Sequence, residues 1–291
     1  MSVTTGIDTP RSENPGAFQF VSDLANELSA GRVELPSFPD TVVRVQHVLR
    51  DEGVTTERVA RVVSAEAGLA ARMLAMANSA LLHRGGEQVT DLKLAIARIG
   101  HDQIRAAAWT YATAQLRRAS TYAAILPQLE RLWQQSVQVA AFAFAMAKES
   151  RRVCPDESLL TGLLHNIGEV YIVARAARQP NGAAQLDEAT TRAWNPSIGR
   201  ALIENWRLPD EIACAVGGQL DSERSQRGAA NVQDVLAVAV AFAAHTAANI
   251  PDNVAMARMP AALALGLTDA AFMRIQLESE SELKMLQEAL G

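Results

Sequence analysis

Apolar side chains return every three or four residues along most of this chain. The clearest runs span residues 20–35, 55–79, 91–99, 129–150, 156–177, 195–209, 231–249 and 268–290. That spacing places the apolar positions on one face of an α-helix, so each run predicts a helix that buries one side. No segment repeats at a fixed period, which argues against a solenoid. The pattern predicts a protein built from packed amphipathic helices.

Residues with strong preferences for helix ends divide these runs. Thr90 is predicted to be the N-cap of a helix that ends at Gly100. Asn195 is predicted to cap another helix, with Pro196 at its first position, because proline lacks the N–H that this position leaves unpaired. Asn231 is expected to begin the long apolar helix near the C-terminus.

Pro127 marks the expected boundary between two tandem helical bundles. We expect a loose tail at residues 1–17, an N-terminal bundle at residues 18–128 and a second bundle at residues 129–291. The composition favours an all-α fold, since Ala, Leu and Val dominate a hydrophobic content of 49% while aromatic residues make up 5%. A chain of 291 residues with this content can bury a sizeable core.

Charge and cysteine content narrow the function classes. The formal net charge is −5, the sequence pI is about 5.6 and basic residues are dispersed, so no direct binding of nucleic acid is expected. The short clusters Arg117–Arg118 and Arg151–Arg152 are interpreted as solvated helix ends. Cys154 and Cys214 show no spacing typical of a zinc site or a disulfide framework, which favours a reducing compartment. We therefore expect a cytoplasmic protein.

The sequence also predicts no association with a membrane. The longest apolar runs, residues 137–147 and 235–244, are shorter than the roughly 20 residues that a spanning helix needs. The first residues lack the basic segment and the following apolar segment of a signal peptide. The two apolar runs are therefore expected to be buried core helices.

The stretch GLLHNIGE, residues 162–169, carries the most distinctive chemistry. His165 is followed by the carboxamide Asn166, within an apolar run that predicts a continuous helix. An aspartate at position 166 would make the pair a strong start for a metal site, because an imidazole and an adjacent carboxylate can reach one divalent ion. No phosphate-binding loop, dinucleotide fingerprint or nucleophile elbow is present, so no catalytic residue is predicted.

Several phrases, taken together and in order, resemble the HDOD output domain of bacterial signalling proteins, a relative of the HD metal phosphohydrolases. They cover roughly residues 18–270 and read LPSFPDTVVRVQHVLRD, VARVVSAEAGLAARMLAMANSALL, LKLAIARIG, LWQQSVQVA, LLTGLLHNIGEVYI and IGRALIENWRLPDEI, followed by the late apolar helix. The resemblance implies an N-terminal helical bundle joined to an HD-like helical bundle, and a role in regulation rather than turnover.

For catalytic HD proteins the resemblance implies a histidine on an early helix, an adjacent His-Asp pair and a distal aspartate, which together hold one or two divalent metals. The corresponding positions here are Gln135, the pair His165 and Asn166, and a position near Phe242. Where related hydrolases carry further histidines, residues 217–219 read GGQ. The chain therefore lacks most of the metal ligands of a catalytic HD protein.

A carboxamide offers a carbonyl oxygen but no negative charge, so one neutral imidazole and two amides should hold a divalent cation poorly. We predict no metal and no other cofactor. Gln135, His165 and Asn166 are instead expected to form a relic HD site in which they hydrogen-bond with one another. His245 on the late apolar helix is a reserve ligand, and a two-histidine site is conceivable if it faces His165.

Asn78 and Ser79, at the end of an apolar run, allow two interpretations. They can bind the last free carbonyls of their helix or the following loop, or they can form a polar junction between the two bundles. In neither case is Ser79 a nucleophile, because no base stands at a spacing that would activate it.

These features predict a regulatory protein without enzymatic activity, which acts by contact with a signalling protein partner. Whether a small ligand also binds in the relic pocket is left open. The alternative is a divergent metal-dependent HD phosphohydrolase acting on a nucleotide or cyclic dinucleotide, which requires His165 to hold a metal. A third hypothesis is a helical scaffold without any ligand.

Overall fold

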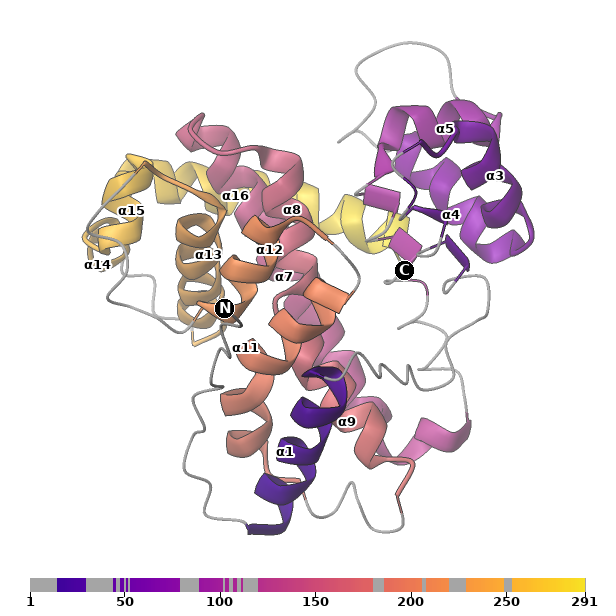
Figure 1. The fold of residues 1–291 in the computed structure, drawn as a ribbon. Helices are drawn as coiled ribbons and strands as arrows, with labels where there is room; N and C mark the ends of the chain where they lie inside the picture. Colours follow the sequence, from indigo (N-terminus) through magenta and orange to yellow (C-terminus); the bar gives the residue numbers. More distant parts are fainter. Residues whose placement is uncertain are drawn as a thin grey trace, which may run out of the picture.

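The computed structural model describes residues 15–29, 44–45, 48–49, 51, 53–78, 89–101, 103–104, 107–108, 111, 120–179, 186–205, 208–219, 229–248 and 253–290. The regular elements in these ranges are all helical, which confirms the predicted all-α class (Figure 1). They are α1 (Pro15–Ser29), α3 (Thr56–Ser64), α4 (Ala67–Ala77), α5 (Leu92–Ile99), the 3₁₀-helix η1 (Ser120–Ile125), α7 (Leu126–Ser150), α8 (Pro155–Leu164), α9 (Ile167–Ala176), α11 (Glu188–Asn205), α12 (Asp210–Gly217), α13 (Val232–Ala247), α14 (Asn253–Ala257), α15 (Pro260–Leu265) and α16 (Asp269–Leu290).

The helices α3, α4 and α5 form a compact group of their own, at the upper right of Figure 1. The predicted end of α5 at Gly100 is confirmed, and this glycine adopts the positive φ of 83° that side chains disfavour. The predicted N-cap was one residue early. Asp91, not Thr90, caps α5, because its carboxylate accepts a hydrogen bond from the Leu94 backbone N–H at 3.0 Å.

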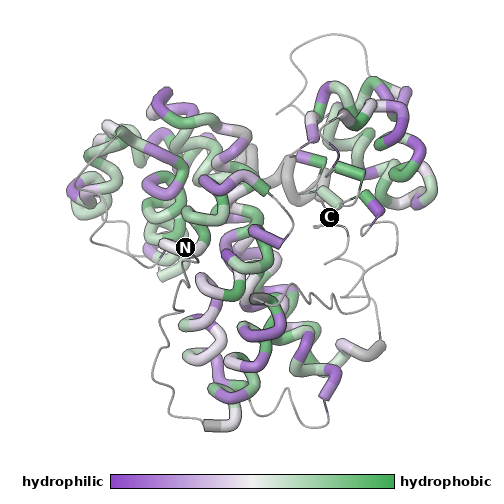
Figure 2. Tube along the Cα trace, in the orientation of Figure 1, coloured by the Kyte–Doolittle hydropathy of each residue, from purple (hydrophilic) through white to green (hydrophobic). Residues whose placement is uncertain are grey.

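The long helix α7 is the central element of the remaining helices. The helices α8, α13 and α16 all pack along it, so residues 139–147 are buried around the whole circumference. In Figure 2 hydrophobic colour runs through the helices at this centre. The alanines in this stretch let the neighbouring helices approach closely. The helix α7 ends at Ser150, and its C-cap residue Arg151 is exposed with a left-handed backbone, in agreement with the interpretation of a solvated helix end. Arg152 is also exposed, but its guanidinium donates to the Ala264 carbonyl oxygen. Arg117–Arg118 lie outside the described residues.

Two predicted helices differ from the observed ones. The run at 156–177 is interrupted at His165–Asn166, where Asn166 leaves helical geometry with φ −107° and ψ 20°, so it forms the separate helices α8 and α9. The Asn195–Pro196 pair does not start a helix but lies inside α11. The side chain of Asn195 is hydrogen-bonded to a different helix, which removes it from capping. The predicted start at Asn231 is confirmed, with a capping box to Asp234.

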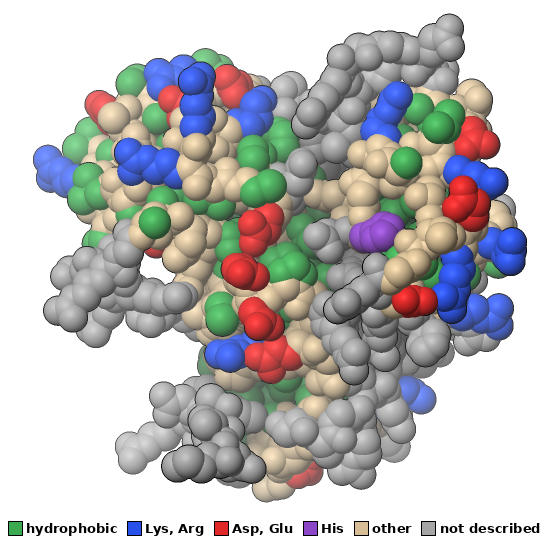
Figure 3. All heavy atoms as spheres, turned by 45° about the horizontal axis from the view of Figure 1, so that its top comes forward, with side chains coloured by type: hydrophobic (Ala, Val, Ile, Leu, Met, Phe, Trp, Pro, Cys, Tyr) green, Lys and Arg blue, Asp and Glu red, His purple; other side chains and the backbone are tan. Residues whose placement is uncertain are grey.

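The first and last described helices both contact helices that lie far from them in the sequence. The helix α1 lies against α11, and α16 contacts both α7 and α4 (Figure 1). The predicted boundary between residues 128 and 129 stays a prediction, and these contacts cross it. No helix within the described ranges combines the length and the apolar character needed to cross a bilayer. On the face shown in Figure 3, Lys and Arg side chains are scattered, whereas Asp and Glu side chains form a short row.

Candidate functional site

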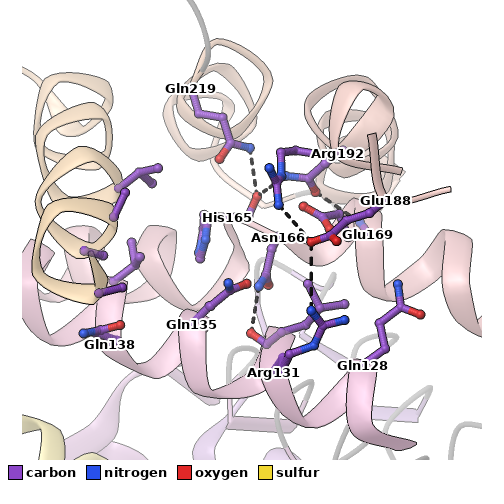
Figure 4. A pocket seen from close by; sticks show the side chains of 17 residues that line it. Gln128, Arg131, Gln135, Gln138, His165, Asn166, Glu169, Glu188, Arg192 and Gln219 are labelled. Carbon is purple, nitrogen blue, oxygen red and sulfur yellow. Dashed lines mark hydrogen bonds and ion pairs between the residues drawn. The ribbon is translucent and has the colours of Figure 1, made fainter. Parts of the chain in front are cut away.

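A cavity of about 360 Å³ lies beside the break between α8 and α9. Five elements or their ends supply its walls: α7, the α8–α9 junction, α11, the end of α12, and α13 (Figure 4). The structure brings the three predicted relic residues, Gln135, His165 and Asn166, together in its lining. The described residues that line it are Gln128, Arg131, Leu132, Gln135, Gln138, Val139, His165, Asn166, Glu169, Glu188, Arg192, Asn195, Gln219, Val240, Ala243, Ala244 and Ala247.

The helix break leaves the carbonyl oxygen of His165 available to other elements. Asn195 of α11 donates an amide N–H to this oxygen at 2.9 Å, and Gln219 at the end of α12 donates a second at 2.8 Å. The Oδ1 atom of Asn195 also accepts the Glu169 backbone N–H at 3.1 Å. These bonds satisfy backbone groups that a helix interruption would otherwise leave unpaired. Two amide side chains therefore fasten α11 and α12 to the break.

The imidazole of His165 is held in one tautomer. Its Nδ1 atom lies 2.8 Å from the Gly162 carbonyl oxygen, which can only accept, so Nδ1 carries the proton and Nε2 is the acceptor. Burial lowers the pKa of His165 to about 4, against a smaller raising effect of the Gly162 hydrogen bond. The ring is therefore neutral at pH 7, and it lies between Gln135 and Gln219 in the cavity lining (Figure 4).

The side chain of Asn166 is fully used in holding α9 against α7. Its Nδ2 atom donates to the Leu132 carbonyl oxygen at 2.7 Å, and its Oδ1 atom accepts from the Ser136 hydroxyl at 2.5 Å. The prediction that Gln135, His165 and Asn166 bond to one another is therefore wrong in its pairing. The three residues share the cavity, but the hydrogen bonds of His165 and Asn166 go to other groups, because the neighbouring turns of α7 and α8 are closer.

One end of the cavity is charged. The Glu188 carboxylate forms an ion pair with Arg192 at 2.9 Å, and Arg131 lies 4.0 Å from the same carboxylate (Figure 4). Glu169 lies in the same end. Burial raises the pKa of the Glu169 carboxyl to about 7, with a lowering effect of Arg192 next in size, then a raising effect of Glu188 and a lowering effect of Arg131.

The opposite wall is formed by α13 and is apolar, with Val240, Ala243, Ala244 and Ala247 lining it. Phe242, placed by the sequence near a ligand position, does not line the cavity. Its ring packs between Phe142 and Phe272, at centroid distances of 4.8 and 5.3 Å. His245 does not line the cavity either, and its Nδ1 atom is 2.9 Å from the Ala241 carbonyl oxygen of its own helix. The reserve-ligand hypothesis for His245 is therefore not supported.

A family model for the HDOD domain matches residues 35–219. The chain belongs to the HDOD domain family. The match includes the three relic residues and Gln219, and it ends before α13.

Solved structures share the HDOD fold over nearly the whole chain. A protein of Shewanella amazonensis SB2B, provisionally called a metal-dependent phosphohydrolase, is 24% identical, with a TM-score of 0.66 over 92% of this chain and 99% of that chain. An HDOD domain protein of unknown function from Geobacter sulfurreducens is 22% identical, with a TM-score of 0.59 over 92% and 97%. A Marinobacter aquaeolei VT8 protein, provisionally called a signal transduction protein, is 19% identical, with a TM-score of 0.54 over 96% and 67%.

A curated relative from Treponema pallidum (strain Nichols) is an uncharacterised protein. It is 21% identical over 201 residues, which make up 65% of this chain and 38% of the relative. The HDOD chain therefore spans well under half the length of that relative.

The cavity of this HDOD protein does not fit the metal set of catalytic HD enzymes. Within the described part of the chain, no three His, Cys, Asp or Glu side chains gather in a way that could hold a metal ion. Asn166 replaces the expected carboxylate, and both ends of its amide are already hydrogen-bonded. His165 offers a single neutral nitrogen. One imidazole without a paired carboxylate ligand gives a divalent cation little gain over water.

The second predicted site is only partly described. Asn78 is the C-cap residue of α4, and its amide donates to the Leu74 and Val89 carbonyl oxygens at 2.9 and 2.8 Å. Its Oδ1 atom accepts the Val89 backbone N–H at 2.7 Å. These bonds agree with the capping interpretation and stay within residues 18–128. Ser79 lies outside the described residues, and a junction between the bundles stays a prediction.

Sequence reasoning did not identify the charged end of the cavity. Glu169 follows His165 by four residues, which is the spacing of neighbours on a helical face, so this signal was present. Arg131 precedes Gln135 by four residues on α7 in the same way. Glu188 and Arg192 gave no comparable signal, because only the packing of α11 against α9 brings them to the site.

Proposed function

We propose that this HDOD protein is a regulatory module without catalytic activity, which transmits a signal through contact with a protein partner in the cytoplasm. The hydrogen bonds of the Asn166 amide are the main observation that supports this proposal. In a catalytic HD pair this position supplies a charged ligand, whereas here both ends of a neutral amide are used to join α9 to α7. The residue has a structural role at the position where a hydrolase needs a metal ligand.

The rest of the site supports the same proposal. The framework around the cavity is intact, and Asn195 and Gln219 hold the helix break in place. The imidazole of His165 is neutral and points its acceptor nitrogen away from its own helix turn. A family neighbour provisionally called a signal transduction protein agrees with a regulatory role.

Exposed apolar side chains on α15 and α16 are consistent with a protein partner. Met273 and Leu277 lie one turn apart on α16 and are 55% and 74% exposed, and Leu263 of α15 is 63% exposed. Such side chains can take part in a protein interface when they join into one patch. The dispersed basic residues give no comparable support for a nucleic-acid partner.

Metal analysis combined with a phosphoesterase assay tests this proposal. Protein purified without chelator is analysed for iron, manganese and zinc and is then assayed against bis(p-nitrophenyl) phosphate and cyclic dinucleotides with each metal added. We expect less than one tenth of a metal ion per chain and no hydrolysis above the buffer rate. His165→Ala serves as the matched variant.

The alternative of a divergent phosphohydrolase predicts a different result. Close to one metal ion per chain, lost in His165→Ala together with hydrolysis, would refute the regulatory proposal. Binding of metal without any hydrolysis would refute only the predicted absence of a metal. The two measurements therefore separate the loss of ligands from the loss of activity.

A further inference from the structure

The polar side chains of the cavity fall into two groups. Asn166, Asn195 and Gln219 use their amides to hold helices together. The carboxylate of Glu169 has no hydrogen bond and no ion pair with the residues that the structure describes, although its backbone N–H is bonded to Asn195. The Nε2 atom of His165, a residue only 7% exposed, likewise has no partner in the described ranges. Both residues line the cavity, so these acceptors are available to a ligand or to water.

The charged end of the cavity has both signs within reach of one small molecule. Arg192 forms an ion pair with the Glu188 carboxylate at 2.9 Å. Arg131 lies farther from the same carboxylate, at 4.0 Å, which is the limit for an ion pair. Arg131 is also 61% exposed, so its guanidinium can turn toward another anion at little cost. The unpaired Glu169 carboxylate faces this cluster (Figure 4).

The other end of the cavity is uncharged. Gln135 and Gln138 of α7 lie there without hydrogen bonds to described residues, opposite the apolar wall of Val240, Ala243, Ala244 and Ala247 (Figure 4). None of the described residues that line the cavity is aromatic, so these residues offer a nucleobase no ring to stack on. The cavity therefore combines a dipolar end with an uncharged end that can take an apolar or amide group.

We propose that this cavity binds a small zwitterion, namely a free α-amino acid with an uncharged side chain. Its ammonium group pairs with the Glu169 carboxylate, its carboxylate pairs with the Arg131 guanidinium, and its side chain extends toward Gln138 and α13. This inference deepens the proposed function, since it names the class of signal that the regulatory module reads.

Charge complementarity decides between this ligand and simpler ions. A phosphate or another anion would satisfy Arg131 but would lie close to the carboxylates of Glu169 and Glu188. A cation would satisfy Glu169 but would lie close to Arg131 and Arg192. A zwitterion places a positive group beside Glu169 and a negative group beside Arg131, and it adds no net charge to the site. The cavity of about 360 Å³ is large enough for an amino acid together with bridging water.

The acidity of Glu169 gives the site a pH dependence. Burial raises its pKa to about 7, so the carboxylate is largely protonated at pH 6 and largely ionised at pH 8. The charged groups facing it are Arg131 from α7 and Glu188 and Arg192 from α11, while His165 stays neutral because its pKa is about 4. Amino-acid affinity should therefore increase as the pH rises from 6 to 8, because an ionised Glu169 is required.

The experiment uses the full chain and calorimetric titration with L-leucine and L-glutamine at pH 8. The blocked analogue N-acetyl-L-leucine lacks the ammonium group and L-leucinamide lacks the carboxylate, and GMP represents an anionic nucleotide. We expect binding of at least one free amino acid, and at least tenfold weaker binding of both blocked forms and of GMP. Failure of both amino acids to bind, or equal binding of a blocked form, would overturn the proposal, as would preferential binding of GMP.

Side-chain variants locate the site. Glu169→Gln and Arg131→Gln should each weaken amino-acid binding at least tenfold, whereas Glu204→Gln should leave it unchanged. Glu204 is the matched control because it pairs with Arg200 on the exposed face of α11 and does not line the cavity. Equal affinity in all three variants would overturn the proposal. If Glu169→Gln does not fold, Arg131→Gln and the blocked analogues decide the outcome. The metal analysis described above is independent of these titrations, so the two proposals can fail separately.

Discussion

At position 166 one amide serves two partners that require opposite roles. Its N–H₂ group donates to the Leu132 carbonyl oxygen, and its carbonyl oxygen accepts from the Ser136 hydroxyl. Only asparagine among the residues of this size can do both, because aspartate has no donor when ionised. The residue that would rebuild the His-Asp pair is therefore unsuited to the packing that this chain has adopted.

The variant Asn166→Asp should be less stable and should still bind no metal. A carboxylate at this position faces the Leu132 carbonyl oxygen and loses the 2.7 Å hydrogen bond, which leaves buried acceptors unpaired. We expect the free energy of unfolding to fall by about 1–3 kcal/mol, measured by denaturant titration.

Asn231→Asp is the matched control for that measurement. Asn231 caps α13 at an exposed position, where aspartate is an equally good cap, so its free energy of unfolding should change by less than about 0.5 kcal/mol. Full stability of Asn166→Asp, together with a bound metal ion, would contradict this account of the site.

The carboxyl of Glu169 should make stability depend on pH. Its pKa is about 7 in the folded protein and near 4.5 in the unfolded chain, so the folded state binds the proton more tightly. This contribution is complete below pH 4.5 and is lost as the pH rises through 7. Glu169→Gln should remove this decline, which is at most about 3 kcal/mol in the wild type. Denaturant titrations at pH 5 and pH 8 measure this decline in the free energy of unfolding. The same decline in Glu169→Gln as in the wild type would contradict its assignment to Glu169.

The residues of the site differ in how far the sequence predicts them. Gln135, His165 and Asn166 were found through the resemblance to a family, and Glu169 could have been found from its spacing of four residues after His165 in the predicted continuous helix. The hydrogen bonds of Asn166 were not predictable, since Leu132 and Ser136 belong to a helix about thirty residues earlier. A local pattern indicates which residues share a face but not which backbone group lies opposite.

At the scale of the elements, the approach of α9 and α11 determines the shape of the site. Gly168, in the first turn of α9, lies against the backbone of α11 at Asn195 and Gly199. This approach brings the Asn195 side chain to the helix break, where it bonds both the His165 carbonyl oxygen and the Glu169 N–H. The predicted helix start at Asn195 failed for this reason, because an Asn-Pro pair is typical of a cap only when its side chain is free.

Gly168→Ala should therefore destabilise the protein strongly. An added Cβ atom would meet the Asn195 carbonyl oxygen and would lie 2.8 Å from the Gly199 backbone nitrogen, and neither backbone group can move without shifting α11. We expect a loss of about 2–3 kcal/mol in the free energy of unfolding. Gly217→Ala is the control, since its Cβ atom would meet only the flexible side chain of Arg200. A Gly168→Ala melting temperature as high as that of Gly217→Ala would contradict the close approach.

At the scale of the whole molecule, the first described helix, α1, packs with the second helical group, that is, the described helices other than α3, α4 and α5. The helix α1 lies on α11, where the Leu28 carbonyl oxygen accepts from Asn205, and Glu27 pairs with Arg175 of α9 at 2.8 Å. Periodicity predicted the helix itself, but a boundary drawn at Pro127 assigns it to the N-terminal bundle. No sequence pattern indicates the partner of an amphipathic face, because any apolar face of similar width can cover it.

Phe18→Ala tests whether α1 covers the second helical group. The Phe18 ring packs edge-on against Trp194 at 5.7 Å, and Trp194 is only 1% exposed. Removing the ring should let water reach the indole, shift the tryptophan emission to longer wavelength and lower the free energy of unfolding by about 1–3 kcal/mol. Gln19→Ala, an exposed substitution on the same helix, should leave both quantities unchanged. If Phe18→Ala shifts neither emission nor stability, α1 does not contribute to the core around Trp194, which would favour its predicted place in the N-terminal bundle.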